Sequence, residues 1–141
     1  MTKKRVVITG LGIVSPVGNT VGDAWNNILA GKSGITNITT IDTTDQAVKF
    51  GGTIKGFDVS DYISPKDAKK MDIFIHYGMA AGIQAVEDSG IEANEENADR
   101  IGVAIGAGVG GLGTIEATAD LYREKVPEEY LHFLFHHLLL I

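Results

Sequence analysis

The chain of 141 residues contains no cysteine. This absence excludes a disulfide framework, a cysteine-ligated zinc site and catalysis by a thiolate of this chain. Basic residues are also scarce, because 12 lysines and arginines stand against 18 aspartates and glutamates, for a formal net charge of −6. A nucleic-acid-binding surface needs a basic footprint, so this charge balance argues against nucleic acid as a partner.

Long apolar runs are missing as well. The opening segment has the basic start of a signal peptide, but Gly10, Gly12 and Pro16 interrupt its apolar stretch. The apolar C-terminal stretch, LHFLFHHLLLI, is shorter than the roughly 18 residues that a membrane span needs. We therefore expect a soluble cytoplasmic protein that does not associate with a membrane.

Glycine is abundant, with 18 residues against only 3 prolines. Residues 5–9 (RVVIT) and 101–105 (IGVAI) are short apolar runs that end in glycine, which predicts buried strands. A further edge strand or hairpin arm is predicted at residues 50–54. Alternating strands, glycine loops and helices indicate an α/β layered fold.

Helices are predicted over residues 20–30, from residues 64–65 onward, over 71–89 and over 114–125. The third of these, residues 71–89, is apolar around most of its circumference, and Gly90 ends it. A helix with so little polar surface is expected to be buried. His76, inside it, is expected to be a hydrogen-bonded packing residue.

Glycines at 108, 110 and 113 form a GxGxxG pattern between a predicted strand and a predicted helix. This is the context of a dinucleotide-binding loop, but the acidic residue expected about 20 positions later is missing. The same glycines also suit a tight turn with close backbone packing. Both interpretations stay open on the pattern alone.

Two side-chain clusters are candidates for binding. His132, His136 and His137 lie about one helical turn apart, but they have no acidic or cysteine neighbour, so we expect no metal site and no cofactor. Lys66, Lys69 and Lys70 share one helical face by their spacing. Such a face is either solvated or a docking surface for an acidic partner.

The blocks RVVITGLGIVSPVGNT, LAGKSGI, KKMDIFIHYGMAAGIQAVEDSG and RIGVAIGAGVGGL resemble the start of the β-ketoacyl-acyl-carrier-protein synthases, above all the type II branch of bacterial fatty-acid elongation. The resemblance covers about residues 3–125. It implies a thiolase-like fold with α-β-α-β-α layers, of which this chain holds the N-terminal portion only, and a homodimer in the full-length family.

The resemblance also implies a reaction. Family members load an acyl chain onto a cysteine and condense it with malonyl-ACP in a decarboxylative Claisen step, assisted by two histidines and a lysine. Those groups lie beyond the resembling segment. Val109 matches the position that gates the acyl pocket, and valine there implies a roomier pocket than isoleucine or phenylalanine. Lys66, Lys69 and Lys70 match a face that docks the acidic acyl carrier protein.

Residues 126–141 do not resemble the family, which has a segment like KGPRKISPFFVPSTIVN at this point. Reading the third base of each codon with the first two of the next, the junctions from Lys125 to His137 permit GPRRISPFFVPS. We therefore expect a frameshifted tail, with a one-base slip near residues 123–126. The three histidines of the tail are then products of the shifted frame.

These observations predict a fragment of a condensing enzyme that is inactive alone and poorly stable. The alternative is a non-catalytic module that binds the carrier protein.

Overall fold

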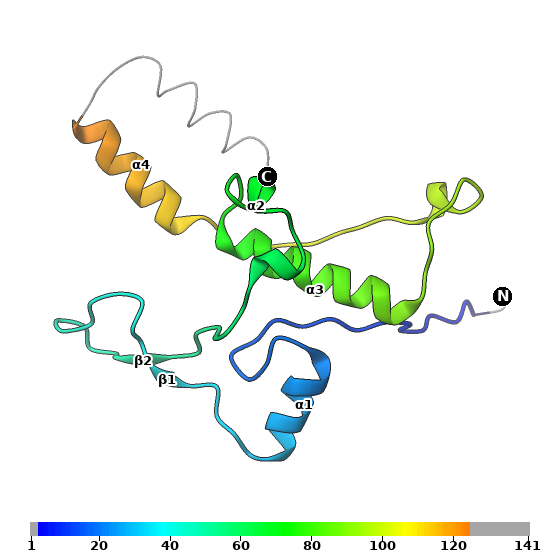
Figure 1. Ribbon diagram of the computed structural model, residues 1–141, viewed down its shortest axis with the longest axis horizontal. Helices are drawn as coiled ribbons and strands as arrows, with labels where there is room; N and C mark the ends of the chain where they lie inside the picture. The colour runs from blue at the N-terminus through cyan, green and yellow to red at the C-terminus, as the bar shows by residue number, and fades with distance from the viewer. Residues whose placement is uncertain (1–2, 125–141) are drawn as a thin grey trace.

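The computed structural model describes residues 3–124 of the chain. Four α-helices dominate the described part (Figure 1). In chain order the elements are α1 (Val21–Leu29), β1 (Thr36–Asn37), β2 (Phe50–Gly51), η1 (Val59–Asp61), α2 (Pro65–Ala68), α3 (Ile73–Ser89), η2 (Ala98–Arg100) and α4 (Leu112–Glu124), where η marks a short 3-10 helix.

The first helix begins and ends where the sequence predicts. The hydroxyl of Thr20 accepts a hydrogen bond from the Asp23 backbone N–H at 3.1 Å, and it donates to the Asp23 carboxylate at 2.9 Å. This pairing satisfies a free N–H of the first turn. Gly31, with φ of +65°, follows the end of α1 in a conformation that favours glycine. The helix predicted over residues 20–30 is therefore confirmed, with Thr20 as its N-terminal cap.

α3 is the longest helix and organises the described part of the chain. It ends at Gly90, whose φ of 63° makes a left-handed cap, as predicted. Gln84 accepts a hydrogen bond from the Ile13 N–H at 3.3 Å, and its side-chain amide donates to the Asn19 carbonyl at 2.8 Å and the Tyr62 hydroxyl at 3.0 Å. A single polar side chain of α3 therefore holds two segments distant in sequence.

The prediction that α3 is a buried helix is wrong for the described residues 3–124. Ala80 is the only buried residue of α3, and the N-terminal segment covers only part of the length of this helix (Figure 1). An evenly apolar helix needs neighbours on every side to bury its surface. The residues described here provide such neighbours on some sides only.

The prediction of buried strands at residues 5–9 and 101–105 is also wrong for the described residues. Residues 5–9 and 101–105 are extended and exposed, and neither belongs to a strand. Within residues 3–124, no backbone hydrogen bond joins either segment to a neighbouring strand. A strand is stable only when a neighbour pairs with its N–H and C=O groups, so the apolar runs remain extended without forming a ladder.

The only sheet of the described residues pairs β1 with β2. The two strands are antiparallel, with Thr36 opposite Gly51 and Asn37 opposite Phe50. The predicted hairpin arm at residues 50–54 is therefore confirmed at its start, although the strand is only 2 residues long.

The buried apolar core of the described residues is small: it consists of Ala24, Ile63, Ala68 and Ala80. Large apolar side chains are exposed instead, for example Val6 at 93% and Val103 at 82%. Exposed apolar surface on this scale promotes association. In residues 3–124, no helix combines the length and the apolar character that crossing a membrane requires.

The exposed apolar surface leads to a prediction for the purified 141-residue chain. We expect it to bind a hydrophobic dye such as ANS, to elute as a mixture of aggregates in size-exclusion chromatography, and to unfold without a cooperative thermal transition, because too few side chains are buried to unfold together. Calorimetry and chromatography on the same sample measure both properties. A monomer with one cooperative transition would contradict the prediction.

Candidate functional site

The three candidate docking lysines lie in and directly after α2. Ser64 caps this helix by accepting a hydrogen bond from the Asp67 N–H at 3.2 Å, and Pro65 occupies its first position. The helix predicted from residues 64–65 onward is therefore confirmed. Lys66 lies within α2, Lys69 is its C-terminal cap, and Lys70 follows. All three lysines are exposed. We call them the α2 lysines.

The charges of the α2 lysines are not equally available. Lys70 forms a salt bridge with Asp67, with 3.4 Å between Nζ and Oδ1. Within residues 3–124, Lys66 and Lys69 form no ion pair. Two of the three positive charges are therefore free to meet an acidic partner, and the third is partly neutralised.

Asp67 links the cap of α2 to this charge cluster. A hydrogen bond from the Ser64 hydroxyl, at 2.7 Å, lowers the pKa of the Asp67 carboxyl, and Lys70 lowers the pKa further. A carboxyl whose pKa is lowered by folding stabilises the fold above its ordinary pKa. That contribution is lost as the pH falls through the lowered pKa, so the cap weakens only in strong acid.

His76 joins α2 to α3. Its Nε2 donates a hydrogen bond to the carbonyl oxygen of Ala68 at 2.9 Å, and its side chain is half-buried. This confirms the prediction that His76 is a hydrogen-bonded packing residue. The bond fixes the end of α2, and with it the α2 lysines, against the first turns of α3.

The loop that carries Val109 lies at the start of α3 and leads into α4. The Val109 side chain is 73% exposed. The next residue, Gly110, packs so closely on Phe74 that a Cβ built on it would lie 2.5 Å from the ring. Gly111 has φ of +68°. Of the three glycines in the pattern, only Gly110 meets a neighbour in this way, because a Cβ on Gly108 or Gly113 would meet nothing within 4 Å. The backbone bend with positive φ lies at Gly111, which suits a tight turn that leads into α4.

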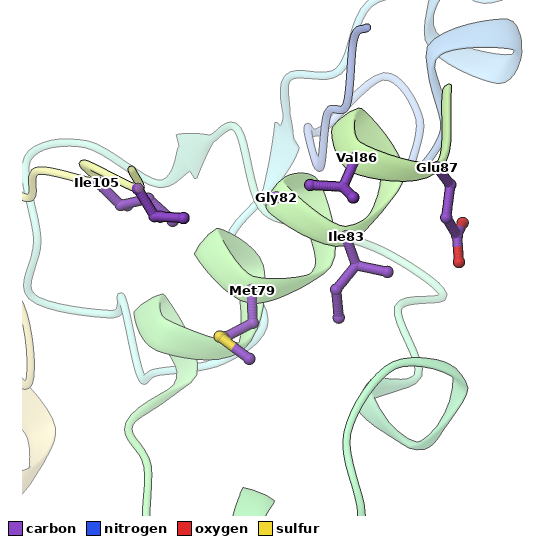
Figure 2. Close-up of a pocket in the computed structure, with 7 residues that line it drawn as sticks. Met79, Gly82, Ile83, Val86, Glu87 and Ile105 are labelled. Carbon is purple, nitrogen blue, oxygen red and sulfur yellow. The ribbon is translucent and has the colours of Figure 1, made fainter. Parts of the chain in front are cut away.

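An open apolar groove of about 460 Å³ lies between α3 and the extended residues near 101–105 (Figure 2). Ile105 lies across from α3, where it packs over Gly78 and Gly82. The residues that line the groove are Met79, Gly82, Ile83, Val86, Glu87, Val103 and Ile105. The sequence pattern did not single out this groove, although the spacing of residues 79, 83 and 86 places them on one helical face.

The first turns of α3 are in contact with both candidate sites. His76 holds the end of α2, and Phe74 packs on the loop of Val109. No hydrogen bond or ion pair within residues 3–124 joins the α2 lysines directly to Val109. The two candidate sites are therefore separate and share α3 as a support.

The histidine cluster at residues 132, 136 and 137 lies outside the described residues. Among residues 3–124, no group of histidines and carboxylates is placed to hold a metal ion.

Comparison with known proteins extends these observations. The model of the family described as "Beta-ketoacyl synthase, N-terminal domain" matches residues 3–135. The "3-oxoacyl-[acyl-carrier-protein] synthase 2" of Vibrio cholerae is 59% identical over 94% of this chain, and its counterpart in Synechocystis is 44% identical over 95%. This chain spans 32% of the length of either relative.

A solved structure shows the same likeness at the level of the fold. The structure titled "The ishigamide ketosynthase/chain length factor" superposes with a TM-score of 0.58 at 31% sequence identity, covering 64% of this chain and 23% of the other. The matched part of the chain is therefore ketosynthase-like, which agrees with the predicted thiolase-like fold at this coarse level. With the family match across residues 3–135, these likenesses show that the chain belongs to the β-ketoacyl synthase family.

Proposed function

We propose that this chain is the N-terminal part of a fatty-acid condensing enzyme and that it contributes a wall of the acyl pocket and a docking face for acyl carrier protein. The observation that carries the proposal is the match of residues 3–135 to the N-terminal domain of the β-ketoacyl synthases. The names of two relatives add the product class, a 3-oxoacyl group on acyl carrier protein.

The complete reaction joins two acyl groups. A cysteine thiolate takes the growing acyl chain as a thioester, and loss of CO₂ from malonyl-ACP supplies the carbanion that attacks its carbonyl. The new carbon–carbon bond leaves 3-oxoacyl-ACP and a free thiol. Because this chain has no cysteine, the proposed role of its residues is to bind and orient, and the chain alone is inactive.

Val109 is proposed to act as the gate of the acyl pocket. Its exposed position, on a loop held by α3, supports this role, since a gate must meet the acyl chain without being part of a packed core. The layered α-β-α-β-α architecture, the homodimer and the cytoplasmic location of the family members are proposed for the enzyme of which this chain forms a part.

The α2 lysines are proposed to bind acyl carrier protein through its acidic surface. We expect the 141-residue chain to bind the carrier protein with an affinity that falls as salt is added, because screening weakens attraction between exposed charges. Substitution of Lys66→Glu together with Lys69→Glu should weaken binding by about tenfold, which corresponds to about 1.4 kcal/mol. Titration calorimetry at low and moderate salt measures the effect.

The matched control changes the same charge elsewhere. Lys4→Glu with Lys32→Glu alters two other exposed lysines, far in sequence from α2, and should leave the affinity within about twofold. If both double variants weaken binding equally, the effect comes from net charge and not from the α2 lysines, and the docking role is wrong.

The second candidate function is a non-catalytic module that binds the carrier protein. The exposed α2 lysines, in a chain without cysteine, favour it. Under this alternative the 141-residue chain competes with a complete synthase for carrier protein and slows it. The first candidate also expects this binding, so the nucleotide sequence separates the two: the first candidate predicts synthase codons in the shifted frame after residue 125, and the binding module does not need them.

The segment after residue 125 is proposed to be read in a shifted frame. The permitted residues GPRRISPFFVPS of the alternative frame support this proposal. The family match extends to residue 135 and so includes part of that segment. The boundary at residue 125 and the frameshifted tail therefore stay predictions, to be tested on the nucleotide sequence.

A further inference from the structure

The carboxylate of Asp72 lies at the start of a helix other than its own. Asp72 is the N-terminal cap residue of α3, but its side chain makes no capping hydrogen bond to α3. Instead, Oδ1 accepts a hydrogen bond from the hydroxyl of Thr114, which lies in the first turn of α4 and 42 positions further along the chain. Asp72 therefore connects the starts of two helices.

The same carboxylate also lies against the loop between them. A Cβ built on Gly111 would lie 2.5 Å from Oδ2 of Asp72, so the carboxylate covers the residue directly before α4. A negative charge at this place is favourable, because the first N–H groups of α4 are free and the helix dipole is positive there. Asp72 thus places a negative charge at the start of α4 and binds its first turn through the Thr114 hydroxyl.

Two contacts therefore hold the loop of Val109 on its C-terminal side. Phe74 packs on Gly110, and Asp72 covers Gly111 and binds Thr114. On its N-terminal side, residues 102–107 form no backbone hydrogen bond with the rest of the described chain. The position of Val109 depends on the first turn of α3 more than on the segment that precedes it.

We propose that Asp72 is a positioning residue for Val109, and that through Thr114 and Gly111 it sets how far the gate reaches into the acyl pocket. This inference rests on the proposed function for the role of the gate, but the positioning itself is independent of carrier-protein binding or catalysis. It follows that loss of the Asp72–Thr114 bond should loosen Val109 and relax the selection of acyl chain length.

The absence of cysteine makes a direct test possible. Val109→Cys introduces a single thiol, and a nitroxide spin label attached to it reports the motion of the gate by electron paramagnetic resonance. A second labelled protein, Asn26→Cys on the exposed surface of α1, reports on the fold away from the loop. Both labels are read in the 141-residue chain at the same temperature and viscosity.

Thr114→Val and Thr114→Ser are the decisive pair. Valine keeps the shape of threonine and removes the hydroxyl, whereas serine keeps the hydroxyl. We expect Thr114→Val to shorten the rotational correlation time of the label at position 109 by about twofold or more, and Thr114→Ser to restore the original value. Asp72→Ala should act like Thr114→Val, because the backbone carbonyl of residue 72 still accepts its bonds from α3.

The result that would overturn the inference is equal mobility of the label at position 109 in the valine and serine variants. Loosening of the label on α1 in Thr114→Val would overturn it too, because that shows a general structural role. Failure of the α2 lysines to bind carrier protein would refute the proposed function and leave this positioning intact. The two failures are therefore distinguishable.

Discussion

The 141-residue chain is expected to form no detectable 3-oxoacyl product from acyl-ACP and malonyl-ACP. Condensation in this family needs a cysteine thiolate to hold the acyl chain, and the chain contains no cysteine. No other residue type is a substitute of equal nucleophilicity near neutral pH. We expect the measured rate to equal that of a sample without protein.

The measurement needs a positive control and a test of the reading frame. The Vibrio cholerae relative, assayed with the same substrates, shows that the carrier proteins are competent.

The gene is then read from the codon for Asp120 to well past that for Ile141. We expect one base to be gained or lost near codons 123–126, after which synthase sequence continues. Product formation by the 141-residue chain itself would contradict the assignment of the nucleophile to a residue outside it.

The local features of the fold could be predicted from the sequence because each depends on residues a few positions apart. Thr20 and Asp23 lie one helical turn apart, and their hydrogen bonds form as soon as the helix does. Gly90 ends α3 because glycine alone adopts a positive φ without cost. Neither feature depends on what the rest of the chain does.

The predicted strands failed for the opposite reason. An apolar run such as residues 101–105 has the composition of a strand, but a strand exists only when a second segment pairs with it. The sequence of the run does not identify that segment. Within residues 3–124 it has no such partner, and the run is extended without a ladder.

The candidate site was predictable only where local spacing or a family pattern marked its residues. The family pattern singled out Val109, but a contact that holds its loop joins Asp72 to Thr114, which lie 42 positions apart. Gln84 similarly reaches the N–H of Ile13 across 71 positions. Periodicity and capping signals extend over a few residues, so contacts at these separations leave no signal in one sequence.

Gly12→Ala is expected to separate the N-terminal segment from α3. A Cβ built on Gly12 would overlap the carbonyl oxygen of Ala81 and lie 2.8 Å from the backbone nitrogen of Ala85. These are backbone atoms of a helix, which cannot rotate away as a side chain can. Overpacking of this kind costs about 1–3 kcal/mol. The segment must therefore move outward, and its hydrogen bonds to α3 are lost.

The amides on either side of Gly12 report this movement. The Leu11 N–H donates to the Asp88 carboxylate at 2.8 Å, and the Ile13 N–H donates to Gln84 at 3.3 Å. We expect both amides to exchange their hydrogens about tenfold to a hundredfold faster in the Gly12→Ala variant, as measured by NMR or mass spectrometry. A local readout is preferable here because global unfolding of this chain is not expected to be cooperative.

Gly22→Ala is the matched control, since it makes the same chemical change in α1, where a Cβ would meet nothing within 4 Å. Alanine in a helix is favoured over glycine by about 0.5–1 kcal/mol, so this variant should retain or gain helix and leave the exchange at residues 11 and 13 unchanged. Equal exchange in the two variants would show that the N-terminal segment is not packed on α3. A difference confined to Gly12→Ala would show that glycine is required there because two backbones meet without room for a side chain.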